Sequence, residues 1–93
     1  MSEPGALART VTIVNLRGLH ARAAAKFVKT AGQFDAQIIV AKQDTEVSGS
    51  SIMGLMMLAA GKGSEIQIRA NGAQAQAALD ALTALIAAKF DED

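Results

Sequence analysis

The sequence predicts a two-layer α+β domain, in which helices cover one face of a largely antiparallel sheet. Segments of alternating polarity interleave with segments whose apolar residues recur at helical spacing, in the order β-α-β-β-α-β-α. Strands that alternate in polarity bury one face only, so the helices are expected on that face. The chain has 93 residues, of which 51% are hydrophobic, and this length predicts a single domain with a packed core.

The first segments predict a strand followed by a helix. Residues 1–8 contain proline and glycine and are expected to form a flexible lead-in. Residues 9–15 (RTVTIVN) alternate in polarity and are rich in β-branched side chains, which is typical of a strand. Residues 21–31 are predicted to be helical, with Gly32 as the stop, because they present one apolar face: Ala24, Phe27, Val28 and Ala31.

The middle of the chain predicts a hairpin and then a short helix. Residues 34–41 and 46–48 are expected to form its two strands around a polar turn at residues 42–45. Ser51 has the side chain of a helix N-cap, which predicts a helix over residues 52–58. This helix contains a glycine, which costs about 1 kcal/mol relative to alanine and weakens the helix on its own.

The last third predicts a strand and a long helix. Residues 64–70 (SEIQIRA) alternate in polarity, and an Asn-Gly turn follows them. Residues 73–90 are predicted to form an amphipathic helix, and residues 91–93 a loose acidic tail. The apolar side of this helix is expected to contain Leu79, Leu82, Leu85, Ile86 and Phe90.

Composition excludes several classes of function. The formal net charge is zero and the only aromatic residues are three phenylalanines, which argues against binding nucleic acid or an anionic membrane surface. The absence of cysteine excludes disulfides and thiolate metal sites, and one histidine without clustered ligands does not support a metal centre. No apolar run approaches the roughly 20 residues that span a bilayer. The N-terminal residues lack the layout of a signal peptide, so a soluble cytoplasmic protein is expected.

Residues 15–28 (NLRGLHARAAAKFV) carry the main functional signal, because they place the only histidine, His20, at a helix start. The first amides of a helix are unpaired and have positive dipole character, which suits an anion. The same dipole disfavours the imidazolium and should keep His20 neutral and nucleophilic. With Arg22 two residues later and Gly18 shaping an accessible loop, the segment predicts an exposed site for a phosphoryl group.

Three segments, read together, resemble the HPr family, the histidine-containing phosphocarrier proteins of the phosphoenolpyruvate-dependent sugar phosphotransferase system. They are residues 18–28 (GLHARAAAKFV), residues 50–66 (SSIMGLMMLAAGKGSEI) and the Asn-Gly turn before the last helix. The resemblance implies an open-faced β-sandwich, a four-stranded antiparallel sheet backed by three helices. It further implies that His20 accepts a phosphoryl group on Nδ1 from enzyme I and passes it to IIA components, while Arg22 contacts the phosphate.

The resemblance also implies roles for the second half of the motif. Ser51 occupies the position of the regulatory serine that an HPr kinase/phosphorylase modifies in part of the family, although the preceding residue, often basic in relatives, is here Ser50. The short helix is apolar in too many directions for all its side chains to be buried, so some should form an exposed patch. The resemblance favours three of them as partner-docking residues: Ile52, Met53 and Met56.

The sequence departs from the family inside the histidine motif and leaves alternatives open. Ala23 stands where relatives usually have proline; alanine keeps the helix, so the site is expected to survive with a slightly looser start. The chain is expected to be a monomeric carrier, without a cofactor, rather than a stand-alone enzyme. One alternative is a carrier of the nitrogen-related phosphotransferase branch, which acts mainly on regulatory proteins. Another is a regulatory binding module without phosphotransfer, against which His20 and Arg22 argue.

Overall fold

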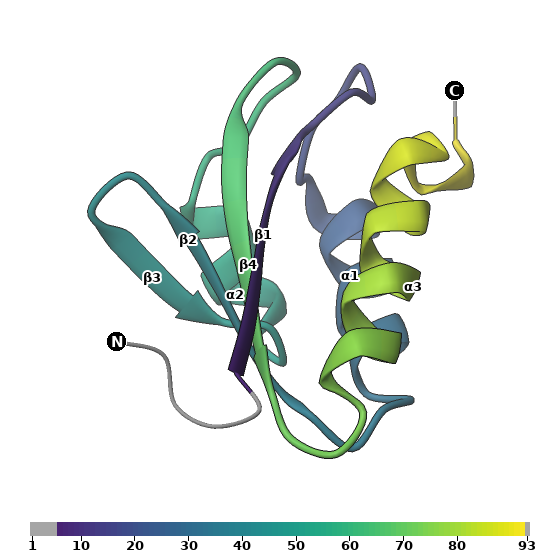
Figure 1. The fold of residues 1–93 in the computed structure, drawn as a ribbon. Helices are drawn as coiled ribbons and strands as arrows, with labels where there is room; N and C mark the ends of the chain where they lie inside the picture. Colours follow the sequence, from purple (N-terminus) through teal and green to yellow (C-terminus); the bar gives the residue numbers. More distant parts are fainter. Residues whose placement is uncertain (1–5, 93) are drawn as a thin grey trace.

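The computed structural model describes residues 6–92 and confirms the predicted α+β class (Figure 1). Four strands form one antiparallel sheet in the order β1-β4-β2-β3. The central position of β4, the last strand in sequence, could not be read from the order of segments alone. The strands are β1 (Ala6–Thr12), β2 (Gln37–Lys42), β3 (Thr45–Ser48) and β4 (Glu65–Asn71).

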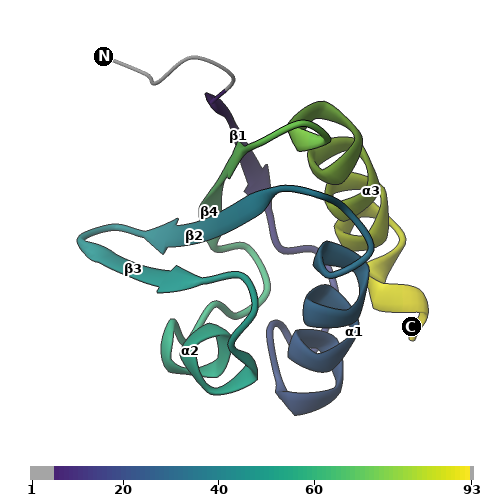
Figure 2. The same ribbon diagram turned by 90° about the horizontal axis from the view of Figure 1, so that it is seen from below.

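Three α-helices lie on the same side of this sheet, which leaves its other face open (Figure 2). They are α1 (Ala21–Ala31), α2 (Ile52–Met57) and α3 (Ala75–Ala87), and a short 3-10 turn, η1 (Lys89–Asp91), follows. Helix α1 packs against both α2 and α3. Within residues 6–92, no helix is long and apolar enough to cross a membrane.

The core forms between the helices and the inner face of the sheet. Strand β4 shows why: Ile66, Ile68 and Ala70 are buried, whereas the alternate residues Glu65 and Gln67 are exposed. Helices α1 and α3 each pack one face into the same core. The buried side chains on these faces are Ala23, Ala24, Phe27, Ala31, Ala75, Ala78, Leu79, Leu82 and Ile86.

Several predicted boundaries need correction. Strand β1 begins at Ala6, because Ala6 pairs with Asn71 of β4, so only residues 1–5 of the predicted lead-in lie outside the described residues. The same strand ends at Thr12 instead of residue 15, because the chain leaves the sheet to form the loop before α1. Strand β2 begins at Gln37 rather than at residue 34, since the chain forms a bend after α1.

The largest correction concerns the C-terminus. Helix α3 ends at Ala87, three residues before the predicted end, and Lys89, Phe90 and Asp91 all have positive φ angles of 59°, 55° and 61°. This left-handed turn tucks Phe90 fully into the core, and burial of a phenylalanine offsets the backbone strain. Glu92 consequently turns back towards the start of α1, so the acidic tail is not loose there; Asp93 lies outside the described residues.

Candidate functional site

His20 is the N-cap residue of α1, as the sequence predicted. Its backbone is extended (φ −74°, ψ 179°), and its carbonyl accepts the first helical hydrogen bond from the Ala24 amide at 2.8 Å. The His20 side chain does not cap the helix. The amides of the first turn are therefore not satisfied by a cap and remain available, with the positive end of the helix dipole, to an anion held beside the ring.

A loop that packs closely against the Ala60 carbonyl places His20 at this helix start. Gly18 has a φ of +65°, and a Cβ there would lie 2.4 Å from the Ala60 carbonyl oxygen, so the position requires glycine for two reasons. The next amide, of Leu19, donates to that same carbonyl at 2.9 Å. The loop before α1 is thereby fastened to the segment that follows α2.

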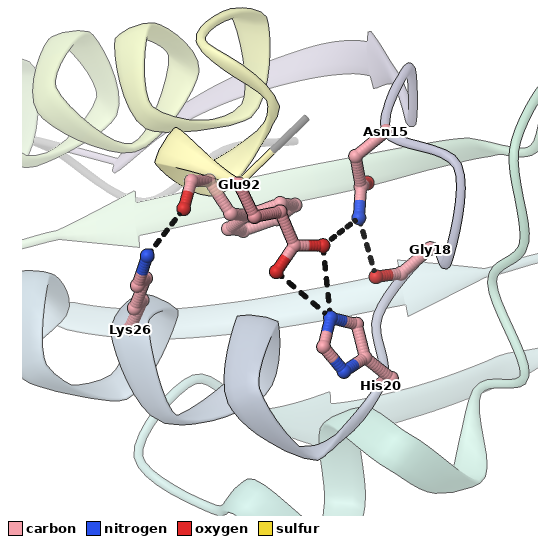
Figure 3. Close-up of polar contacts among 6 residues, drawn as sticks. Asn15, Gly18, His20, Lys26 and Glu92 are labelled. Carbon is pink, nitrogen blue, oxygen red and sulfur yellow. Dashed lines mark hydrogen bonds and ion pairs between the residues drawn. The ribbon is translucent and has the colours of Figure 1, made fainter.

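The His20 ring is partly exposed and has one bonded and one open nitrogen. Its side chain is 24% exposed. Nε2 lies 2.9 Å and 3.0 Å from the two carboxylate oxygens of Glu92 (Figure 3). Within residues 6–92, Nδ1 makes no hydrogen bond, and the ring presents this nitrogen away from the carboxylate. A neutral ring that donates from Nε2 has its lone pair on Nδ1, the atom that a phosphoryl group requires.

Asn15 donates a further hydrogen bond to the carboxylate that contacts His20. It is fully buried, and its Nδ2 donates to the Gly18 carbonyl and to Glu92 Oε1, each at 2.9 Å (Figure 3). Because both partners are acceptors, the amide group must present nitrogen here, which fixes its orientation. Its Oδ1 is buried without a hydrogen-bond partner among the described residues, a cost that the two donated bonds must offset.

Glu92 stays ionised in this position. The hydrogen bond from the His20 ring lowers the pKa of its carboxyl, burial opposes this shift, and the Asn15 hydrogen bond and the positive charge of Arg22 add to the lowering. The side chain is only 9% exposed, so the carboxylate is held by specific partners rather than by water.

Arg22 lies in the first turn of α1 and is exposed. Within residues 6–92, its guanidinium makes no hydrogen bond or ion pair, so it is available to an incoming anion, as its predicted role requires. Lys26, one turn later, is engaged instead: its Nζ donates to the Phe90 carbonyl at 2.6 Å and fastens the C-terminal turn to α1 (Figure 3).

Ser51 is the N-cap of α2, which confirms the predicted cap. Its Oγ accepts a hydrogen bond from the Gly54 amide at 2.9 Å. A Cβ at Gly54 would lie 3.1 Å from both Ser51 Oγ and the Val47 Cβ. This crowding explains why the short helix contains a glycine despite its low helix propensity.

Helix α2 exposes most of its apolar side chains. Only Leu55 is buried within it, and Leu58 is buried just after it. The remaining large side chains form an exposed group that we call the α2 patch, which includes the three predicted docking residues and adds one methionine: Ile52 (42% exposed), Met53 (71%), Met56 (42%) and Met57 (75%).

Two site residues, Asn15 and Glu92, were not predicted from the sequence. Asn15 stands at the start of the histidine motif, but the pattern placed it in a strand, where its side chain would have no special partner. Glu92 gave no signal, because the left-handed turn that brings it to His20 has no sequence pattern in residues without glycine. Within residues 6–92, no group of three histidine, aspartate or glutamate side chains could hold a metal ion.

Comparison with known proteins agrees with this geometry. The family model for the PTS HPr component phosphorylation site matches residues 7–88. The phosphocarrier protein HPr of Pseudomonas putida is 54% identical over 86 residues, covering 91% of this chain and 96% of that protein. The phosphocarrier protein NPr of Shewanella violacea is 49% identical, covering 92% of this chain and 94% of that protein.

Solved structures show the same fold. HPr-C-His from Thermoanaerobacter tengcongensis superposes with a TM-score of 0.89 at 42% identity, covering 94% of this chain and 98% of the other. An HPr dimer from the same organism superposes with a TM-score of 0.75 at 42% identity, covering 99% and 100% of the two chains. The histidine at an uncapped helix start, the sheet order and these matches lead to one conclusion: the chain belongs to the PTS HPr family, the phosphocarrier proteins of the phosphotransferase system.

Proposed function

We propose that this chain carries a phosphoryl group on Nδ1 of His20, which it accepts from enzyme I and passes to IIA components. The observation that carries the proposal is that the two ring nitrogens differ. Nε2 is hydrogen-bonded to Glu92, whereas Nδ1 is open beside the uncapped start of α1. The Nδ1 lone pair attacks phosphorus, and the bond between phosphorus and the donor breaks with its electron pair leaving on the donor. The reverse step, onto an acceptor protein, returns the electron pair to Nδ1.

Arg22 and the first-turn amides of α1 would offset the charge of the bound phosphoryl group. Both lie on the same turn as His20, and the guanidinium of Arg22 is exposed. A charge-assisted hydrogen bond is worth about 1.5–3 kcal/mol, which corresponds to roughly tenfold or more in rate if it is made in the transition state. A carrier needs this stabilisation to be moderate, because the group must also leave.

The test is phosphorylation by enzyme I and phosphoenolpyruvate. An acid-labile, base-stable phosphate is expected on His20, and it should be absent in His20→Ala. Arg22→Ala should slow transfer by about tenfold while the circular dichroism spectrum stays unchanged. Lys29→Ala removes the same charge from the last turn of α1 and serves as the matched control. Failure of the wild-type chain to accept phosphate from an enzyme I that charges a known HPr would refute the proposal.

Ser51 is proposed as a second, regulatory phosphorylation site for an HPr kinase/phosphorylase. Its hydroxyl caps a six-residue helix that also carries the exposed α2 patch. A phosphate adds about −1.5 to −2 charges, which a helix start tolerates, so the fold should persist. The added charge next to the patch would instead oppose docking of an acidic enzyme I surface.

A carrier of the nitrogen-related branch is the second candidate, because NPr of Shewanella violacea is almost as similar as the HPr relatives. The chemistry at His20 would be the same, and only the recipients would differ. Transfer from the charged chain to a sugar-specific IIA, compared with transfer to a nitrogen-related IIA, separates the two. For either candidate we propose a cytoplasmic protein that works as a monomer, and a sedimentation measurement tests this against the dimer seen for the Thermoanaerobacter tengcongensis protein.

A further inference from the structure

Glu92 forms a contact that a phosphoryl acceptor does not obviously need. A carboxylate accepts hydrogen bonds only, so the 2.9 Å and 3.0 Å contacts require Nε2 of His20 to be the donor. A neutral imidazole has one ring proton, and a proton on Nε2 leaves Nδ1 with the lone pair. The contact thus selects one of the two tautomers that a free histidine samples.

We propose that Glu92 is a positioning residue that fixes the tautomer and orientation of His20, so that Nδ1 is the nucleophile in both directions of transfer. This inference rests on the proposed function and deepens it, because it names Glu92 as the group that keeps the ring proton of His20 on Nε2. Its logic is that of other catalytic histidines, whose far nitrogen is held by a carboxylate.

The contact is built into the fold rather than formed by a free tail. Phe90 anchors the turn in the core, and the Lys26 Nζ holds its carbonyl at 2.6 Å (Figure 3). Three successive residues adopt left-handed φ angles to reverse the chain, a conformation that costs roughly 1–2 kcal/mol per residue. Such strain persists only where surrounding contacts impose it, and here the outcome is a carboxylate placed on the ring.

Asn15 holds the carboxylate through a second hydrogen bond. Its Nδ2 donates to Glu92 Oε1 and to the loop carbonyl of Gly18, so one buried amide connects the C-terminal turn to the loop that precedes His20. The other charged groups around the pair are Arg22 in the first turn of α1 and Lys26 in the second. Both are cations, so Glu92 is the one carboxylate that the described residues bring to the ring.

The proton arrangement has a consequence for reversible transfer. When Nδ1 bonds to phosphorus, positive charge develops on the ring, and the adjacent carboxylate stabilises it. When the N–P bond breaks, the electron pair returns to Nδ1 and leaves a neutral ring whose proton is still on Nε2. No proton moves in either step, which suits a carrier that must run the reaction both ways.

The test measures the tautomer separately from transfer. Nitrogen-15 spectra of ¹⁵N-histidine protein at about pH 8 should show an unprotonated Nδ1 and a protonated Nε2 in the wild-type chain. Glu92→Ala and Glu92→Gln should shift both nitrogens towards a mixture of tautomers. Each variant should also lower kcat for phosphorylation by enzyme I by about tenfold with little change in KM. Asp91→Asn removes the same charge from the exposed neighbouring residue and should change neither quantity.

Unchanged ring shifts in both Glu92 variants would overturn the inference, and so would transfer that is unchanged or faster than wild type. The two proposals fail in different ways. A wild-type chain that accepts no phosphate refutes the carrier function, even if the tautomer is fixed. A wild-type chain that is charged normally, with variants that keep the same ring shifts and rates, refutes only the role of Glu92.

Discussion

Three side chains, two from the loop that leads into α1 and one from the C-terminal turn, satisfy one another's hydrogen-bonding requirements at the site. Asn15 needs two acceptors and finds them in Glu92 and the Gly18 carbonyl; His20 needs one acceptor for Nε2 and finds the same carboxylate. Glu92 in turn needs donors to remain ionised while only 9% exposed. The arrangement leaves Nδ1 of His20 as the open polar atom of the ring, which is the property the chemistry requires.

The lowered pKa of Glu92 predicts how stability depends on pH. Because the folded-state pKa lies below the ordinary value of 4.5, the contact contributes fully above that pH, and its contribution is lost as pH falls through the lowered pKa. Urea unfolding of wild type and Glu92→Gln between pH 7 and pH 3 measures this. The difference in free energy of unfolding between wild type and Glu92→Gln should be constant near pH 7 and should shrink towards zero as the pH approaches 3.

Asp91→Asn provides the reference for that titration, since Asp91 makes no contact with the site among the described residues. The difference in free energy of unfolding between Asp91→Asn and wild type should not shrink on acidification in the way expected for Glu92→Gln. A Glu92→Gln difference that stays the same from pH 7 to pH 3 would mean that the carboxylate is not held by the ring.

At the scale of single residues, the sequence predicted the chemistry of the site but not every residue that forms the site. His20 and Arg22 follow from local pattern, because a glycine-containing loop, a helix start and an arginine are all within five residues. Glu92 lies 72 positions from His20 in sequence and reaches it only through the packing of Phe90. Contacts of that kind depend on tertiary structure, and no short-range pattern contains them.

Among the elements, α2 depends most on its caps. It has six residues, too few to be stable alone, and Ser51 holds its first turn while Lys42 donates to the carbonyls of Leu58 and Ala59 at its end, at 3.2 Å and 3.1 Å. Ala59 follows with a φ of 52°, which ends the helix abruptly. A helix held at both ends can expose most of its apolar side chains without unfolding.

The cap predicts opposite effects for two substitutions of Ser51. Ser51→Ala removes the acceptor of the Gly54 amide and should lower the free energy of unfolding by about 1 kcal/mol, with little effect on charging by enzyme I. Ser51→Asp keeps an acceptor at the cap, so stability should stay close to wild type, whereas charging should slow several-fold. Chemical denaturation and the enzyme I assay measure the two effects independently.

A matched acidic substitution at the preceding residue distinguishes cap geometry from added charge. Ser50→Asp places a carboxylate one residue earlier, outside the Gly54 bond. Equal rates of charging for wild type and Ser51→Asp would remove the regulatory proposal. A loss of stability in Ser51→Asp as large as in Ser51→Ala would show that the cap does not accept a carboxylate.

The order of elements was predictable, and their ends were less so. Periodicity identified all four strands and three helices, because polarity alternates in strands such as β4 and recurs every three to four residues in α1. The predicted end of α3 was wrong, because Phe90 continues the apolar pattern of that helix although its backbone is left-handed. A side chain can fit a helical pattern and yet reach the core from a turn.

For the whole molecule, the sheet order explains why the functional surface lies where it does. The strands pair as β1-β4-β2-β3, and all helices lie on one side, so the chain connections bring the loop before α1 against the segment after α2 (Figure 2). The bond between the Leu19 amide and the Ala60 carbonyl, 2.9 Å, fixes that junction. The histidine loop is therefore bonded directly to the segment that follows the helix exposing the α2 patch.

This junction predicts that the α2 patch and His20 are used together by the same partner. An exposed, methionine-rich apolar group is costly on a monomer unless a partner covers it, and flexible side chains suit several partners in turn. Met53→Gln and Met56→Gln should each raise KM for charging by enzyme I by about fivefold, equivalent to roughly 1 kcal/mol of lost contact, and leave kcat nearly unchanged. Ala84→Gln, an exposed change on α3, is the control. Equal KM values for all three variants would place the docking surface elsewhere, whereas a fall in kcat alone would mean that the methionines act on the ring and not on the partner.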